Sequence, residues 1–199
     1  QLARNALDLQ RENIISRKLK ELFLGCALEG RYSKEELLDL YLNWIPFGQN
    51  AYGLEQASQA YFGKSASGLT LAESAVLAAL PQRPSYFSPY GKHVRTDVTN
   101  EALGRILAGT ITTAEELSDE DIVIGLLGNV IGTGATTVAV GGRTDQVLRN
   151  MQDAEMITEA ERLQALKELE TITFKASRED IRAPHFVLWV KSLVDEVLN

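Results

Sequence analysis

The sequence predicts a mostly α-helical domain with one small β-hairpin, and three observations support this fold class. Ser/Thr-x-x-Glu sequences occur at four places along the chain, a pattern in which hydroxyl and carboxylate cap the first backbone N–H groups of a helix. Apolar residues at helical spacing follow most of them. Only residues 130–140 combine β-branched side chains with a glycine-containing turn at 132–134, which is typical of a short hairpin.

Composition narrows the class of protein. Hydrophobic residues make up 45% and charged residues 24% of the 199 positions, as in ordinary soluble globular domains. The net charge of −7 disfavours nucleic acid as a general partner, because phosphate binding needs a basic surface. The single cysteine, Cys26, excludes an internal disulfide and any multi-cysteine metal site. The first residue is Gln1, so we expect the sequence to be part of a longer chain.

The first predicted helix covers about residues 16–28. Apolar side chains recur along it at helical spacing, and we expect this face to be buried in the core. Cys26 lies on the same face, where a small core residue is a better interpretation than a nucleophile. The members of this apolar face are Leu19, Leu22, Phe23 and Cys26.

The opposite face of this helix carries Arg17, Lys18 and Glu21, which are three and four residues apart and therefore neighbours on its surface. Such a cluster suits a phosphate-bearing substrate, because Arg offers a planar fork of donors and Lys a point charge. The carboxylate could act in acid–base chemistry, orient a cation or hold a divalent metal. An ordinary exposed helix surface with ion pairs is the alternative interpretation.

Capping sequences predict the later helices. Thr70/Glu73 and Thr158/Glu161 precede apolar runs at 71–80 and 163–169. Thr113/Glu116 instead opens an acidic stretch at 115–121, which we expect to be a solvated helix start. Glycine- and proline-containing breakers separate the helices at 46–48, 63–68 and 81–91. The four capping pairs are Ser33/Glu36, Thr70/Glu73, Thr113/Glu116 and Thr158/Glu161.

Several side chains that suggest a site have ordinary explanations. Trp44, Phe47 and Tyr52 are expected to pack in the core. His93 and His185 lack metal-ligand spacing, so we expect loop or interface roles for them.

Ordered motifs give a more specific indication than any single residue. They are RKLKE at 17–21, RYSKEELLDLYLN at 31–43, FG at 47–48, AYG at 51–53, AYFGK at 60–64, and LAE at 71–73 through LPQRP at 80–84, with QLARN at 1–5 and RTDQVL at 143–148. In this order they resemble the family-51 glycosyltransferases. These peptidoglycan transglycosylases form the N-terminal domain of class A penicillin-binding proteins and also occur as monofunctional enzymes.

The resemblance implies a lysozyme-like helical fold that acts on lipid II at the membrane surface. The 4-hydroxyl of an acceptor sugar attacks the anomeric carbon of the growing chain and expels undecaprenyl pyrophosphate with inversion. A first glutamate acts as base, and a second works near the pyrophosphate, which basic side chains and often a divalent metal (Mg²⁺ or Mn²⁺) help to hold. No organic cofactor is implied.

The family's functional residues carry over by position. Glu21 matches the second glutamate and is the catalytic candidate. The candidates for contact with the substrate and its pyrophosphate are Gln1, Arg4, Asn5, Arg17 and Lys18, and the candidates that shape the cleft are Lys34, Asp39, Tyr41, Asn43 and Arg143.

The chain also departs from the family pattern. The first family motif, E-D-x-x-F-x-x-H-x-G, carries the catalytic base and would precede Gln1, so we expect the 199 residues alone not to polymerise lipid II. Arg4 replaces the usual Lys, Asp39 a common Glu, and Thr144 the second Arg of an R-R-x-x-V-L motif. Residues 93–142 are longer than expected, and the sequence suggests no role for them.

The resemblance also implies context. Residues 1–176 would be the glycosyltransferase domain, and residues 177–199 a linker or the start of a transpeptidase domain. The whole enzyme would sit at the extracytoplasmic face of the bacterial inner membrane, held by an N-terminal helix. Its partners would be lipid II, the growing glycan chain, the membrane surface and a cell-wall synthesis complex.

Two alternatives to a glycosyltransferase remain. A lysozyme-like glycan-cleaving enzyme is disfavoured by the Arg17/Lys18 pair, because glycan cleavage has no pyrophosphate to hold. A non-catalytic helical interaction module is disfavoured because Arg17, Lys18, Glu21 and Asn43 are all retained. The sequence upstream of Gln1 would separate these possibilities.

Overall fold

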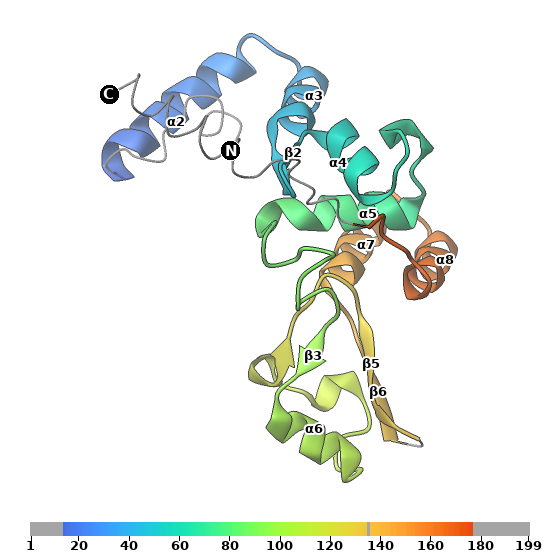
Figure 1. The fold of residues 1–199 in the computed structure, drawn as a ribbon. Coiled ribbons are helices and arrows are strands. Elements are labelled where there is room, and N and C mark those ends of the chain that lie inside the picture. The colour runs from blue at the N-terminus through green and yellow to red at the C-terminus, as the bar shows by residue number, and fades with distance from the viewer. Residues whose placement is uncertain (1–13, 135, 177–199) are drawn as a thin grey trace, which may run out of the picture.

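Helices dominate the computed structural model, which describes residues 14–134 and 136–176 and side chains from Lys18 onward, and this confirms the mostly helical fold class. Figure 1 shows three tiers along the molecule. The upper tier consists of two helices, the middle tier is a group of helices, and the lower tier is a small unit of helix and strands. The upper tier holds α2 (Ile14–Glu29) and α3 (Lys34–Trp44); the middle tier holds α4 (Leu54–Tyr61), α5 (Leu71–Ala79), α7 (Arg143–Asp153) and α8 (Glu159–Glu170); the lower tier holds α6 (Asn100–Leu107) and the longest strands.

The predicted capping sequences all lie at element starts. At Ser33, Thr70 and Thr158, the hydroxyl accepts a hydrogen bond from the third residue of the helix, whose glutamate accepts one from the cap N–H in return. At Thr113, the carboxylate of Glu116 accepts from the backbone N–H at 3.4 Å, but only the short 3-10 helix η4 (Ala114–Glu116) follows. A second short helix, η5 (Asp119–Asp121), comes next, so the acidic stretch forms two single turns rather than one helix.

The main core surrounds α5 in the middle tier. Small residues such as Ala72, Ala75 and Ala79 are buried along α5, which packs against both α7 and α8. Tyr61 of α4 is fully buried, and its hydroxyl donates a hydrogen bond to the carbonyl of Phe47 at 2.8 Å. That carbonyl belongs to β1 (Pro46–Gly48), which pairs antiparallel with β2 (Ala51–Tyr52), a pairing that the sequence did not predict.

The lower tier has a hydrophobic core of its own. The hairpin of β5 (Asn129–Thr133) and β6 (Thr136–Val140) confirms the prediction for residues 130–140, with Ile131 paired to Val138. Helix α6 packs on this hairpin, and β3 (Asp97–Val98) pairs antiparallel with β4 (Ile122–Val123) beside it. We call residues 97–140 the inserted unit; its core consists of Val98, Ala102, Ile106, Ile111, Ile131, Val138 and Val140.

The inserted unit is tied closely to the middle tier. The backbone N–H of Thr96 donates to the carbonyl of Leu127 at 2.8 Å, and the Thr96 hydroxyl accepts from Gly125 and donates to the carbonyl of Gly141. A Cβ atom on Gly125 would lie 2.2 Å from the carbonyl carbon of Arg95, so only glycine allows this approach. These bonds hold the segment that enters the inserted unit, at Thr96, against the segment that leaves it, at Gly141.

The prediction that the apolar face of α2 is buried was wrong. Leu19, Leu22 and Phe23 are 65%, 66% and 78% exposed, and Cys26 is exposed as well. Among the elements that the structure describes, α3 is the main neighbour of α2, and one neighbouring helix covers only one side of another. Helical spacing identifies an apolar face but does not supply the element that covers it.

The three aromatic residues assigned to the core have different outcomes. Phe47 is buried as predicted, whereas Trp44 and Tyr52 are 52% and 60% exposed. Trp44 is the last residue of α3, and Tyr52 lies on a two-residue strand, so neither is enclosed by neighbouring elements.

Within residues 14–134 and 136–176, every helix is too short or too polar to span a bilayer.

Candidate functional site

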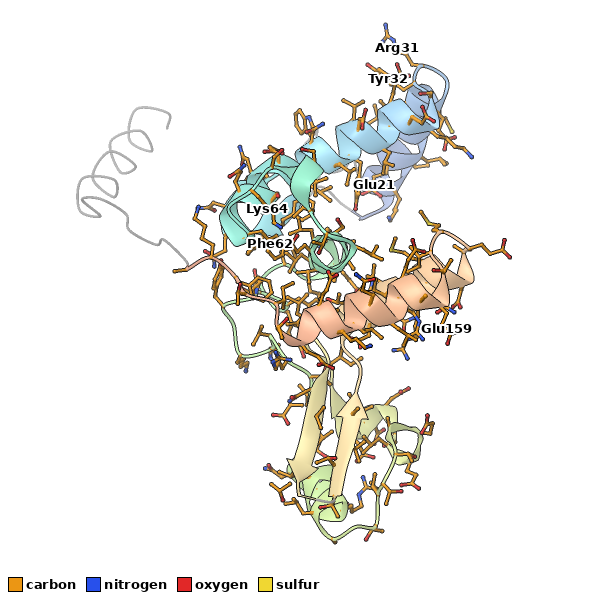
Figure 2. The ribbon with its side chains drawn as sticks, turned by 90° about the vertical axis from the view of Figure 1, so that its right-hand side faces the viewer. Glu21, Arg31, Tyr32, Phe62, Lys64 and Glu159 are labelled. Atoms are coloured by element: carbon orange, nitrogen blue, oxygen red, sulfur yellow. The ribbon has the colours of Figure 1, made fainter. Side chains whose placement is uncertain are left out.

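Helix α2 brings Lys18 and Glu21 together, as their spacing predicted. Lys18 Nζ lies 2.8 Å from Glu21 Oε2, in a salt bridge whose lysine side chain is 62% exposed and whose glutamate side chain is 16% exposed. Figure 2 shows Glu21 on α2, next to α3. Arg17 lies on the same helix one residue before Lys18, but its side chain is outside the described part. Gln1, Arg4 and Asn5 lie outside the described residues.

Helix α3 carries four of the residues predicted to shape the cleft. Lys34 is its first residue and is exposed, as is Asp39 in its middle. The side-chain amide of Asn43 donates to the backbone carbonyl of Asp39 at 2.9 Å, one residue before the helix ends at Trp44. Asn43 therefore bonds within the last turn of the helix. Tyr41 is half-buried.

A pocket of about 560 Å³ lies between α3, α5 and the start of α7, and we call it the α3–α7 pocket. Its walls are largely apolar, with Leu42, Phe47 and Leu69 among them. Two predicted cleft residues, Tyr41 and Arg143, both line this pocket although they are far apart in the sequence. The structure thus forms two groups, since Lys18 and Glu21 are not among the residues that line this pocket.

Two polar residues of the α3–α7 pocket were not found from the sequence. Ser74 lies on the exposed side of α5, within an otherwise apolar run, so no local pattern marks it. Gln82 belongs to the 3-10 helix η3 (Leu80–Gln82) that follows α5, inside the LPQRP motif. Its position in that motif is the feature of the sequence that could have identified Gln82 as a pocket residue. His93 lies in the loop after η3, as predicted, and its ring stacks on Tyr86 at a centroid distance of 4.0 Å.

Carboxylates near the site set limits on metal binding. Among the described residues, no group of three or more His, Cys, Asp and Glu side chains is placed to hold a metal ion. Glu21 offers a single carboxylate that also contacts Lys18. This donor set fits Mg²⁺ held jointly by one carboxylate and substrate phosphate oxygens, rather than a site built from protein alone.

Comparison with known proteins finds similarity over the first half of the chain. The sequence profile of a family described as transglycosylase matches residues 1–108, more than half of the chain. Penicillin-binding protein 1A of Clostridium tetani is 43% identical over 123 residues, which are 61% of this chain and 15% of that protein. Penicillin-binding protein 1A of Escherichia coli is 46% identical over 108 residues, 54% of this chain and 13% of that protein.

Among solved structures, a crystal structure of penicillin-binding protein 1A from Haemophilus influenzae is 30% identical and aligns with a TM-score of 0.47, covering 83% of this chain and 18% of that one. The chain therefore spans less than a fifth of the length of each of these three relatives.

Proposed function

Because this chain belongs to the transglycosylase family, we propose that it forms part of a peptidoglycan glycosyltransferase, which polymerises lipid II into glycan strands and releases undecaprenyl pyrophosphate. The observation that carries the proposal is the Lys18–Glu21 salt bridge of 2.8 Å, on a helix inside the matched residues. A cation held in place by a carboxylate is suited to a site where a pyrophosphate develops negative charge.

The proposed reaction forms one bond and breaks one bond. The 4-hydroxyl oxygen of the acceptor sugar bonds to the anomeric carbon of the growing chain, while the bond from that carbon to the pyrophosphate oxygen breaks with inversion. The acceptor proton passes to a first glutamate, which we place in a part of the whole protein outside this sequence. Arg17 and Lys18 receive the charge of the pyrophosphate, and Glu21 holds the Lys18 ammonium group through their contact.

Replacing Glu21 by Gln in the whole protein tests this assignment. The change keeps the shape of the side chain and removes its charge, so polymerisation of fluorescent lipid II should slow by about 10²-fold or more. Glu29→Gln is the matched control, because Glu29 is an exposed carboxylate at the end of the same helix. A Glu21→Gln rate equal to that of the control would contradict the proposal.

The products distinguish the transferase from a glycan-cleaving enzyme. A transferase consumes lipid II, lengthens the glycan and releases undecaprenyl pyrophosphate, which chromatography of the lipid products detects. Shortening of preformed glycan without use of lipid II would instead support a hydrolase.

The carboxylate of Glu21 would also hold a divalent metal, Mg²⁺ or Mn²⁺, together with oxygens of the pyrophosphate. The ion would supply further positive charge for the leaving group. Chelation with EDTA should lower the polymerisation rate of the whole protein, and added Mg²⁺ or Mn²⁺ should restore it. An unchanged rate after chelation would remove the metal from the proposal.

The substrate's lipid chain requires the enzyme to work at a membrane surface. We place the whole protein at the extracytoplasmic face of the bacterial inner membrane, with the growing glycan chain and cell-wall synthesis proteins as its partners, and residues 177–199 lead into a transpeptidase domain. Cell fractionation and protease accessibility from the outer side of that membrane test the location. Labelling of the whole protein by fluorescent penicillin tests the transpeptidase.

A further inference from the structure

Arg143 lines the α3–α7 pocket and has no counter-ion among the residues that the structure describes. Its Nε atom is buried and has no hydrogen-bond partner, and none of the ion pairs between described side chains includes it. Arg143 is also the first residue of α7, and the partial positive charge at a helix N-terminus makes a cation unfavourable there. A half-buried guanidinium at this position costs free energy unless an anion meets it.

The rest of the pocket indicates what carries that anion. Leu42, Phe47 and Leu69 offer apolar walls that suit small hydrophobic groups, and Ser74 and Gln82 offer a hydroxyl and an amide. These two polar groups can bond to the N–H and C=O groups of a peptide. A volume of about 560 Å³ is in the range of small-molecule sites.

We propose that the α3–α7 pocket binds the terminal carboxylate of the stem peptide carried by the glycan substrate, an inference that rests on the proposed function. The fork of donors on Arg143 matches a carboxylate with two parallel hydrogen bonds. Small apolar side chains at the end of the peptide contact the apolar walls, and Ser74 and Gln82 bond to the last peptide groups. The pocket thereby selects substrates whose peptide ends in a free carboxylate.

Helix α3 lies between the two groups of residues. Glu21 lies on α2, which packs against α3, and α3 supplies Tyr41 to the pocket. The eleven residues of α3 form a helix about 16 Å long. An extended pentapeptide spans about 17 Å. A peptide attached to a sugar near Glu21 would run along α3 toward Arg143.

The test compares two lipid II substrates in the whole protein, one with a free terminal carboxylate and one with a terminal carboxamide. The unmodified enzyme should have the lower KM for the carboxylate. Arg143→Gln should raise that KM about tenfold, to the value for the carboxamide, because a hydrogen-bonded charge is lost, and should change KM more than kcat. Arg143→Lys keeps the charge without the fork and should restore part of the preference.

Arg149→Gln is the matched control, because it removes an exposed arginine from the same helix and should keep the preference. An unmodified enzyme that treats both substrates alike would overturn the inference. So would an Arg143→Gln enzyme whose KM rises equally for both, since Arg143 would then support the protein rather than the peptide. Absence of turnover with either substrate would overturn the proposed function itself.

Discussion

Tyr61 shows how one buried side chain connects separate parts of the main core. Its hydroxyl donates to the Phe47 carbonyl at 2.8 Å, which joins α4 to β1, and its ring stacks on Tyr90 with centroids 5.9 Å apart. Burial raises the pKa of Tyr61 to about 12, with a smaller contribution from the neighbouring Tyr90. The phenol therefore stays neutral in the folded protein at a pH where it ionises in the unfolded chain.

The pKa of Tyr61 predicts a loss of stability in alkali. The unfolded phenol ionises near pH 10, so the free energy of unfolding should fall as the pH rises from about 10 to about 12. Tyr61→Phe should reduce this pH dependence and should cost about 1–3 kcal/mol at neutral pH, because the Phe47 carbonyl loses its donor. Urea unfolding at pH 8 and pH 11 measures both effects. The exposed Tyr52→Phe is the control, and equal behaviour of the two variants would contradict the prediction.

At the scale of elements, local charges hold the turns of the inserted unit. Asp121 ends η5, where its carboxylate accepts from the backbone N–H and hydroxyl of Ser118 and pairs with Arg105 of α6. These bonds, led by the backbone bond from Ser118, lower the pKa of Asp121 to about 2. The carboxylate thus joins η5 to α6 in its charged form.

Asp121 should make the inserted unit sensitive to acid. Its folded pKa lies below the ordinary value of 3.8, so its stabilising contribution is present above about pH 4 and is lost as the pH falls toward 2. Asp121→Asn should lower the thermal midpoint at pH 7 and weaken its decline between pH 4 and pH 2. Circular dichroism melting curves measure this, with the exposed Asp119→Asn as the control on the same short helix. A midpoint unchanged by Asp121→Asn would show that the contact is not stabilising.

At the scale of the whole molecule, two hydrophobic cores divide the chain. One surrounds α5 and includes the fully buried Leu148, and the other fills the inserted unit around the fully buried Ile106. Because the cores are separate, we expect damage to one to leave the other largely intact.

Two truncations test this division. Ile106→Ala and Leu148→Ala should each cost about 2–5 kcal/mol, since each leaves a cavity in a packed core. Hydrogen exchange followed by mass spectrometry should report faster exchange in residues 97–140 for Ile106→Ala. For Leu148→Ala, the faster exchange should lie in α5, α7 and α8. Uniformly faster exchange in both variants would mean that the two cores unfold as one unit.

Features that depend on near neighbours along the chain can be predicted from the amino-acid sequence. The presence of α2, α3, α5 and α8, the capping residues of the last three and the hairpin predicted at 130–140 follow from spacing within a few residues, or from two strands joined by a short turn. The salt bridge of Lys18 with Glu21 is of the same kind, because three residues along a helix bring their side chains together. Family membership also follows from the order of motifs.

Features that depend on distant segments appear only once the chain is folded. The tertiary structure left the apolar face of α2 exposed, placed Tyr41 and Arg143 on one pocket and built residues 97–140 into a unit with its own core. Helices α4, α6 and α7 were not predicted from the sequence, although Thr99 caps the start of α6. Burial and pockets are produced by packing between elements, and the spacing of residues within one element carries no information about which element will lie against it.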